Sequence, residues 1–299
     1  MSFPLFTLLV LTFWSLSVER APEPDPPPFE HALYKTGIER FNVTAMLFEQ
    51  QYGSEQAASL RALKQELVGL GHSEEVVANV LSQARLNERV AELFSSNILR
   101  SADTGDISYE DFANRINLEE LKQNSHGFAQ EHMTELMQAE EQYGVDYRFI
   151  VAIKGIETRY GERGFTGNFN VLNSLVTQYV LTNRKRISVS QLDAILKLNE
   201  KFDAQVHTFN GSFAGAIGVA QWMPFSLLHY GKMERIEDIT STRKMIPSTA
   251  NYLRENGWRP SLNGTPVEPG SRNWNAILRY NRSSTYARVV VEIAEQMQR

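Results

Sequence analysis

The 299-residue chain contains no cysteine. This absence excludes disulfide bonds, a thiolate nucleophile, a cysteine-ligated metal site and an anchor built on a lipid-modified cysteine. The sequence also lacks a basic run, and its formal net charge of −5 does not favour nucleic acid as a partner. We find no repeat of fixed period, which argues against a solenoid or an array.

Segments that alternate between apolar and polar residues are scarce, so strands are not expected to be the main elements. Apolar residues recur instead at helical spacing, in a composition (42% hydrophobic, 22% charged) typical of a globular protein. The sequence therefore predicts a mainly α fold. Helices are expected over 30–52, 55–70, 73–84, 87–94, 126–143, 146–161, 171–181, 189–202, 241–256, 273–280 and 284–298, with a minor hairpin around Asn263 and Gly264.

The N-terminus carries an apolar run, 3–18, that is too short for a comfortable membrane span. With small residues near its end it predicts a signal peptide over 1–20 and export to the periplasm. No Lys or Arg precedes the run, so an uncleaved anchor that tethers the protein to the membrane stays open as an alternative. A proline-rich linker, 21–30, follows, and the folded domain is expected from about residue 31 to 299.

One predicted helix, 146–161, carries a candidate catalytic acid. Asp146 is a plausible N-cap, and Glu157 falls seven residues after Ile150, at the edge of the apolar arc. Loss of water at that position raises the pKa of a carboxyl, which suits a general acid. The alternative is a solvated surface pair between Glu157 and Lys154, three residues earlier, which would lower that pKa.

Three later stretches also stand out: 210–224, which is rich in glycine and alanine and ends in Q-W-M-P, 251–258 with N-Y-L and G-W, and 278–287 with R-Y-N-R-S. Tight helix packing would explain the small residues of the first. An amide beside an indole, Gln221 and Trp222, equally suits a sugar site, because amides hydrogen-bond acetamido and hydroxyl groups and an indole stacks on a pyranose face.

Taken in order, E-T-R-Y-G, G-S-F-A-G-A-I-G-V-A-Q-W-M-P, A-N-Y-L…G-W and R-Y-N-R-S…Y-A resemble the lytic murein transglycosylases, most of all the membrane-bound lytic transglycosylase B family. The resemblance runs from about Gly71 to the end. It implies a lysozyme-like transglycosylase core over about 126–299, with an additional N-terminal helical region over about 31–125. It also implies an enzyme of cell-wall turnover that binds peptidoglycan glycan strands, with other cell-wall enzymes as possible partners and no cofactor.

The resemblance implies a role for each matching residue. Glu157 matches the single catalytic acid and base, and Tyr280 and Asn281 match a pair beside the reaction centre. The other matching positions are expected to bind substrate: Ser212, Gln221, Trp222, Met223, Tyr252, Arg184 and Lys185. Trp222 stands where the family usually has phenylalanine, a departure that keeps an aromatic side chain.

The expected reaction cleaves the β-1,4 bond between N-acetylmuramic acid and N-acetylglucosamine without water and leaves a 1,6-anhydromuramoyl end. A single motif carboxylate supports this route, because hydrolytic glycosidases usually use two. Glu162, five residues after Glu157, is interpreted as a loop acid. A lysozyme-like muramidase and a weakly active peptidoglycan-binding scaffold are the rival hypotheses.

A calcium loop that is common in the family has no counterpart here, since the segment after Pro224 reads H-Y-G-K-M-E-R-I-E-D-I without the ligand spacing. We therefore predict that the protein binds no metal. A chelator should leave both the melting temperature and the activity unchanged, as measured by thermal denaturation and by peptidoglycan digestion. A drop in either would reveal a calcium site.

Overall fold

The computed structural model describes residues 35–95, 108–161, 167–260 and 266–297. The predicted signal peptide, the proline-rich linker, Glu162 and the hairpin around Asn263 lie outside these ranges. The described chain is mainly helical, which confirms the predicted fold class. Its one sheet pairs two short antiparallel strands, β1 (Phe169–Asn170) and β2 (Asn210–Gly211), with Phe169 opposite Gly211.

The helices follow one another along the chain as α2 (Gly37–Tyr52), α3 (Ser54–Gly69), α4 (Glu74–Leu81), α5 (Glu88–Ser95), α7 (Tyr109–Ile116), α8 (Leu118–Glu131), α9 (Met133–Tyr143), α10 (Tyr147–Thr158), α11 (Val171–Leu181), α12 (Lys185–Phe202), α13 (Pro224–Tyr230), α14 (Thr242–Glu255), α15 (Arg272–Tyr280) and α16 (Ser284–Gln296). Two 3₁₀ turns, η1 (Val206–Thr208) and η2 (Ile236–Thr240), lie between them.

Polar residues at the helix starts explain several of these boundaries. A cap side chain that accepts a backbone N–H satisfies one of the donors left free in the first helical turn. Thr36 forms a full capping box with Glu39 at the start of α2. The same bond is made at later helix starts by Ser108, Asp146, Asn170, Ser241, Ser271 and Ser283.

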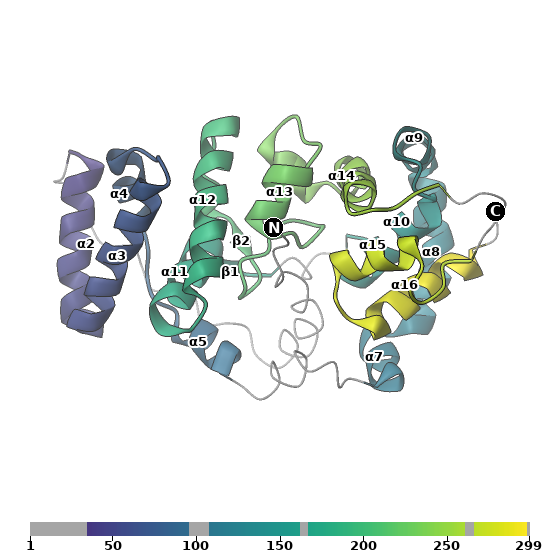
Figure 1. Cartoon of the computed structure of the whole chain (residues 1–299), viewed down its shortest axis with the longest axis horizontal. Helices are drawn as coiled ribbons and strands as arrows, with labels where there is room; N and C mark the ends of the chain where they lie inside the picture. The colour runs from purple at the N-terminus through teal and green to yellow at the C-terminus, as the bar shows by residue number, and fades with distance from the viewer. Residues whose placement is uncertain (1–34, 96–107, 162–166, 261–265, 298–299) are drawn as a thin grey trace.

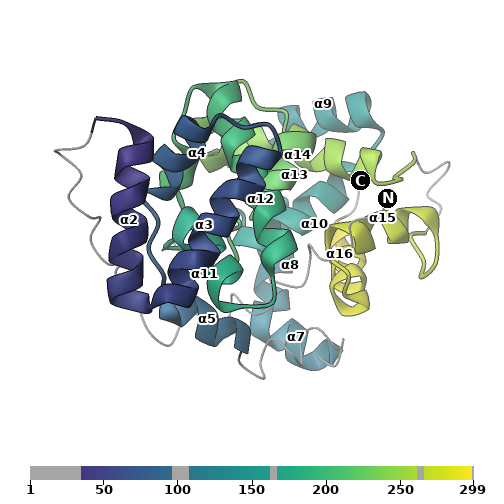
Figure 2. The same ribbon diagram turned by 60° about the vertical axis from the view of Figure 1, so that its left-hand side comes forward.

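The helices are distributed along an elongated molecule, with α2, α3 and α4 toward one end, α12 and α13 in the middle, and α8, α9 and α16 toward the other end (Figure 1). At one end α2, α3 and α4 pack on one another, and α3 packs on α11 and α12. At the other end α10 contacts α8, α9, α14 and α16, an arrangement also visible in the turned view (Figure 2). A continuous cluster of buried apolar residues, from Phe41 to Met297, joins both ends. The domain division predicted at 125/126 falls inside α8 and stays a prediction.

One helix prediction and one alternative interpretation are wrong in detail. The helix predicted over 126–143 is broken at His132, whose backbone (φ −114°, ψ 18°) separates α8 from α9. The apolar pattern continues through this break, so periodicity alone could not reveal it. For the glycine- and alanine-rich stretch 210–224, tight helix packing is one of two interpretations, and the structure does not support it. The stretch forms β2 and turns joined by bridges of Ile217 to Gly211 and Trp222, before α13 begins at Pro224.

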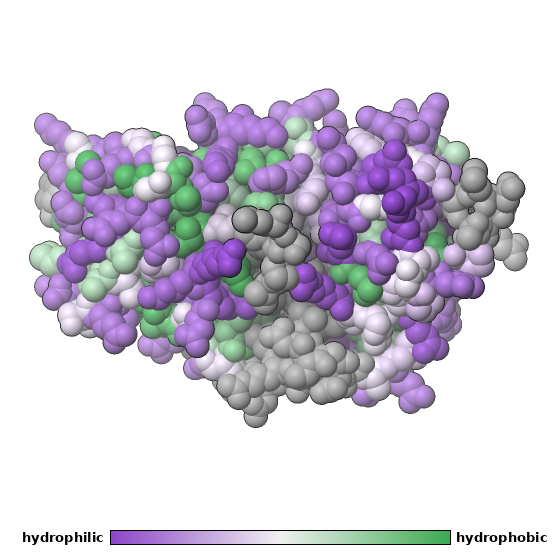
Figure 3. Space-filling view, viewed as in Figure 1, coloured by the Kyte–Doolittle hydropathy of each residue, from purple (hydrophilic) through white to green (hydrophobic). Residues whose placement is uncertain are grey.

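The face seen in Figure 3 is covered mostly by hydrophilic residues, with hydrophobic ones in smaller areas. Among the described residues, exposed large apolar side chains are few, and Leu70 is the most exposed at 54%. None of the helices in the described ranges combines the length and the apolar character needed to cross a membrane.

Gly155, in the middle of α10, is a point of close approach that can be tested. A Cβ at this position would lie 2.6 Å from Cζ of Tyr160, whose hydroxyl donates to the carbonyl of Leu121 at 2.7 Å. We predict that Gly155→Ala lowers the free energy of unfolding by about 1–3 kcal/mol, the usual cost of overpacking. Urea denaturation would measure the change.

Gly127 supplies the matched control, because it is an exposed helical glycine of α8 and a Cβ added to it would meet only open space. Gly127→Ala should stabilise the protein by roughly 0.5–1 kcal/mol through helix propensity alone. Equal effects of the two alanines would show that Tyr160 does not constrain α10.

Candidate functional site

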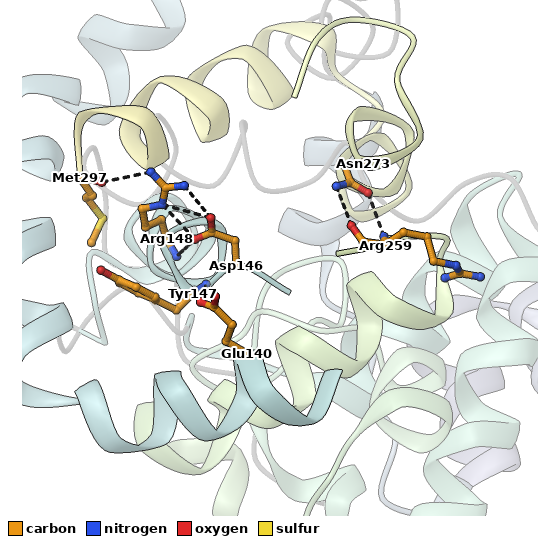
Figure 4. A network of polar contacts seen from close by, with 7 residues as sticks. All are labelled: Glu140, Asp146, Tyr147, Arg148, Arg259, Asn273 and Met297. Carbon is orange, nitrogen blue, oxygen red and sulfur yellow. Dashed lines mark hydrogen bonds and ion pairs between the residues drawn. The ribbon is translucent and has the colours of Figure 1, made fainter. Parts of the chain in front are cut away.

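The start of α10 is fixed by polar contacts to two other helices (Figure 4). The Asp146 carboxylate accepts from the Arg148 backbone and pairs with its guanidinium at 2.6 Å, and Arg148 also donates to the carbonyl of Met297 at 3.3 Å. The Glu140 carboxylate, from α9, accepts the Tyr147 backbone N–H at 3.0 Å. These contacts tie α10 to α9 and to the end of α16.

The segment that leads into α15 is held in a similar way. The Asn273 amide accepts from the backbone N–H of Arg259 and donates to the Arg259 carbonyl, both at 2.9 Å (Figure 4). Trp258, just before it, packs edge-on against Phe149 of α10, with ring centroids 4.8 Å apart. The helix that carries the candidate acid is therefore fixed from several sides.

The end of α10 adopts an unusual backbone. Arg159 (φ 48°), Tyr160 (φ 64°) and Gly161 (φ 90°) lie consecutively in the left-handed region, which non-glycine residues enter at an energetic cost. Tertiary contacts hold this turn: Arg159 pairs with Glu120, and Thr158 donates to the carbonyl of Val219 at 3.1 Å. The last helical turn, which contains Glu157, is thus pinned to α8 and to the 210–223 loop.

Glu157 is buried, with 3% of its surface exposed. The Tyr286 hydroxyl of α16 donates to Oε1 at 2.8 Å, whereas Oε2 has no hydrogen-bond partner in the described part of the chain. Burial raises the pKa of the carboxyl to about 8, and the Tyr286 hydrogen bond and the Lys154 charge oppose the rise. The raised pKa agrees with the sequence prediction, and the solvated surface pair is wrong because Lys154 is fully buried too.

An aromatic cluster of Trp222, Tyr252, Tyr280 and Tyr286 lies against this carboxyl. The rings of Tyr280 and Tyr286 stack at 6.5 Å with an interplanar angle of 6°. The Trp222 indole donates to the Tyr280 hydroxyl at 2.6 Å, and Tyr252 meets Tyr280 edge-on at 4.9 Å. The structure thus brings four residues from α14, α15, α16 and the 210–223 loop to one place.

This arrangement changes the interpretation of Trp222. The sequence suggested an indole available for stacking on a sugar ring, but only 3% of the residue is exposed and its N–H is bound to Tyr280. Tyr252 is similarly engaged, because its hydroxyl donates to the carbonyl of Arg279 at 2.6 Å. In this structure the two side chains support Tyr280.

The other predicted residues of the 210–223 loop have contacts of their own. Ser212 Oγ accepts the backbone N–H groups of Ala214 and Ala216, so the hydroxyl shapes the turn. Gln221 has a left-handed backbone (φ 47°), and its amide donates to the carbonyl of Gly218 at 2.9 Å. Met223 is 5% exposed and occupies the N-cap position of α13 without a side-chain hydrogen bond to the helix. Substrate contact by these residues stays a prediction.

Asn281 ends α15 and is fully buried. The side-chain oxygen Oδ1 accepts the backbone N–H of Ser283 at 3.2 Å. The side-chain nitrogen Nδ2 lacks a hydrogen-bond partner within the described ranges. A buried amide donor without a partner carries a desolvation cost, which a ligand oxygen can remove. This observation favours the predicted binding role of Asn281.

Arg184 and Lys185 lie at the start of α12. The Arg184 guanidinium stands over the Phe94 ring at 4.7 Å and donates to Gln178 at 3.1 Å. The Lys185 ammonium stands over the Tyr179 ring at 5.3 Å. The structure places these cations beside α5 and α11, whereas the aromatic cluster adjoins α10.

Sequence reasoning missed two residues at this site. Tyr286 lies in one of the resembling blocks without an expected role, since only the fold shows that its hydroxyl reaches Glu157. For Lys154 the sequence offers only a surface pair, and no local signal contradicts that interpretation. Within the described ranges, no group of three or more His, Asp or Glu side chains is placed to hold a metal ion.

Comparison with known proteins shows which family the sequence belongs to. The sequence profile of the family described as "Transglycosylase SLT domain" matches residues 55–269. The membrane-bound lytic murein transglycosylase B of Escherichia coli (strain K12) is 30% identical over 144 residues, which cover 46% of this chain and 38% of that protein. The chain thus matches well under half the length of this curated relative.

Solved structures share the fold. The soluble lytic transglycosylase SltB1 from Pseudomonas aeruginosa superposes with a TM-score of 0.66 at 20% identity, over 79% of this chain and 97% of that one. SltB3 from the same organism, solved in complex with NAG-NAM-pentapeptide, gives a TM-score of 0.63 at 24% identity, over 79% and 78% of the two chains. With the family profile spanning most of its length, this chain belongs to the transglycosylase SLT domain family.

Proposed function

We propose that this protein is a peptidoglycan lytic transglycosylase. It cleaves the β-1,4 bond between N-acetylmuramic acid and N-acetylglucosamine without water and releases 1,6-anhydromuramoyl ends. The observation that carries the proposal is the isolation of the Glu157 carboxyl, which is buried and hydrogen-bonded through one oxygen only. Its burial raises the pKa of the carboxyl to about 8, which suits a general acid. Family membership supports the same reaction class.

The small number of buried carboxylates among the described residues favours a non-hydrolytic reaction. Asp238 is the other buried carboxylate among the described residues, and its Oδ2 accepts the backbone N–H groups of Glu234 and Arg235 as a cap of η2. It is therefore committed to local structure. Most hydrolytic glycosidases need a second carboxylate across the scissile bond to activate water or attack the sugar. A single acid instead suits a reaction in which the substrate supplies its own nucleophile.

The proposed mechanism uses Glu157 twice. Because Oε1 is held by Tyr286, Oε2 is the oxygen that carries the proton to the glycosidic oxygen as the bond to C1 breaks. The acetamido group of the muramoyl sugar stabilises C1 from the opposite face. The Glu157 carboxylate then takes the proton of the muramoyl 6-hydroxyl while O6 bonds to C1, so the acid is regenerated and no water is consumed.

The substrate side of the site rests on fewer contacts. We propose that Asn281 and Gln221 bind sugar amide and hydroxyl groups, and that Trp222, Tyr252 and Tyr280 support them. Ser212 and Met223 shape the loop, and Arg184 and Lys185 bind the glycan farther from the reaction centre. Glu157 is 3% exposed, so the groups that cover it must move when a glycan enters.

We further propose that the catalytic unit spans residues 31–299 and acts in the periplasm. The apolar run 3–18 and the proline-rich linker support export, and the substrate is a cell-wall polymer. The same run supports membrane association if it is retained. Other cell-wall enzymes are possible partners by resemblance alone.

The product distinguishes this reaction from its rival. Digestion of purified sacculi should release muropeptides that end in 1,6-anhydromuramic acid, because the 6-hydroxyl and not water attacks C1. Mass spectrometry separates the two products, since an anhydro end is lighter than a reducing end by one water. A preponderance of reducing ends would replace this proposal with a muramidase.

Glu157→Gln tests the acid itself. The amide keeps the size of the side chain and can accept from Tyr286, but it neither donates nor takes the catalytic proton. We predict a loss of turnover at the upper end of the ~10²–10⁴-fold range of general acid–base catalysis, with folding and peptidoglycan binding retained. Rates of muropeptide release, circular dichroism and sacculus pull-down measure the three properties.

Glu162→Gln is the matched control, because it removes the next carboxyl along the chain. It should keep activity within a few-fold of wild type. If both variants are inactive, two carboxylates act together and the one-acid mechanism is wrong. If Glu157→Gln stays active, the assignment of Glu157 fails.

A further inference from the structure

Gln178 is a fully buried residue of α11 whose side-chain amide joins three segments of the chain. Its Nε2 donates to the carbonyl of Ala214, in the 210–223 loop, at 3.1 Å. It also donates to the carbonyl of Ser174, one turn earlier in α11, at 3.1 Å. Its Oε1 accepts from Nε of Arg184, which directly precedes α12, at 3.1 Å. One amide therefore satisfies polar groups of α11, of the loop and of the start of α12.

The orientation of this amide is determined by its partners. The nitrogen lies against two carbonyl oxygens and the oxygen lies against a guanidinium N–H, so exchanging the two atoms would set donor against donor and acceptor against acceptor. Loss of the amide would leave these groups without a partner in a place that water does not reach. A buried polar network whose members are all satisfied specifies one arrangement of the segments that it joins.

A second set of contacts links Arg184 to the same part of the loop. The Arg184 guanidinium stands over the ring of Phe94, at 4.7 Å from the centroid. The Phe94 ring in turn packs against the ring of Phe213, with the two centroids 5.3 Å apart. Phe213 directly precedes Ala214 and is 2% exposed. Arg184 is therefore joined to the loop in two ways, through the Gln178 amide and through the Phe94 ring.

The part of the loop that Gln178 holds leads to the aromatic cluster beside the candidate acid. Ser212 Oγ accepts two backbone N–H groups of the turn 212–216 and so fixes its shape. Directly after this turn, Ile217 and Trp222 exchange backbone hydrogen bonds of 2.9 and 3.3 Å. The Trp222 indole then donates to the Tyr280 hydroxyl. The loop thus contacts the surroundings of Arg184 at one end and supports Tyr280 at the other.

We propose that Gln178 is a positioning residue for glycan binding: its amide holds the Arg184 guanidinium and the turn 212–216 in one fixed arrangement, so that glycan contact at Arg184 and the shape of the loop depend on each other. This inference rests on the proposed function, which assigns Arg184 to glycan binding. Gln178 does not touch the glycan, because it is fully buried. It acts through the two groups that it joins.

A double-mutant cycle tests this dependence, because residues that act through one contact have non-additive effects. Gln178→Met, Arg184→Met and the double variant are made in the full chain that also carries Glu157→Gln, so that binding is measured without reaction. The Kd for fluorescently labelled, uncross-linked glycan strands should rise in each single variant. The double variant should bind at least about threefold more tightly than the product of the two single effects predicts. Additive effects, or an unchanged Kd in Arg184→Met, overturn the inference.

Gln178→Glu separates the two halves of the contact. The new carboxylate still accepts from Arg184, but it cannot donate to the carbonyl of Ala214 and repels that oxygen instead. This variant should therefore bind the strands at least as weakly as Gln178→Met does. A Kd equal to that of the parent protein would show that the link to the loop is not needed and would overturn the inference. If Gln178→Met does not fold, as judged by circular dichroism, Gln178→Glu takes its place in the cycle.

Gln191→Met is the matched control. Gln191 is also fully buried, two helical turns after Arg184 in α12, and its Oε1 accepts the backbone N–H of Phe225 at 3.0 Å. It shares no partner with Arg184, so its effect on the Kd should be additive with that of Arg184→Met. Coupling as large as that of Gln178 would show a general loss of packing in place of a specific link, and would overturn the inference.

The binding cycle and the product assay fail independently of each other. Reducing ends among the released muropeptides would overturn the proposed reaction, but they would leave a non-additive cycle, and with it this inference, in place. An additive cycle in a protein that releases anhydro ends would overturn the role of Gln178 alone.

Discussion

The hydrogen bond from Tyr286 to Glu157 is the contact on which the rest of the site depends. It joins the last turn of α10 to α16, holds one carboxyl oxygen and leaves the other without a partner in the described part of the chain. The polar contacts at the start of α10 and the left-handed turn at its end serve the same geometry, because they fix the helix at both ends. Without this rigidity, burial would remove water from the carboxyl but would not fix the orientation of its two oxygens.

Much of the fold could be predicted from the sequence because long helices carry their pattern locally. The apolar spacing of α2, α3 and α10 and the N-cap Asp146 of α10 indicate the existence and approximate bounds of these helices. The break at His132 could not be predicted, since α8 and α9 present continuous apolar faces on either side of it. The turns of 210–223 depend on bridges between residues that a local pattern does not pair.

The same distinction applies to the site. The raised pKa of Glu157 followed from its place on a buried helical face, which is a local property. The inward orientation of Trp222 could not be predicted from the local sequence, because it depends on Tyr280, which lies 58 positions later in the chain. Lys154 shows the limit most clearly: its spacing from Glu157 is the same for a solvated surface pair and for a buried couple. Only the packing of α8, α9, α14 and α16 around α10 decides between them.

The separation of Glu157 and Tyr286 by 129 positions also has a kinetic consequence. Contacts between distant segments carry a large loop-closure entropy and are therefore expected late in folding, after local helices have formed. An intermediate with α10 in place but α16 undocked would hold its carboxyl in water, ionised at neutral pH and unable to donate a proton. Such a chain contains every residue of the candidate site without its geometry, so the proposed activity depends on the final tertiary contacts.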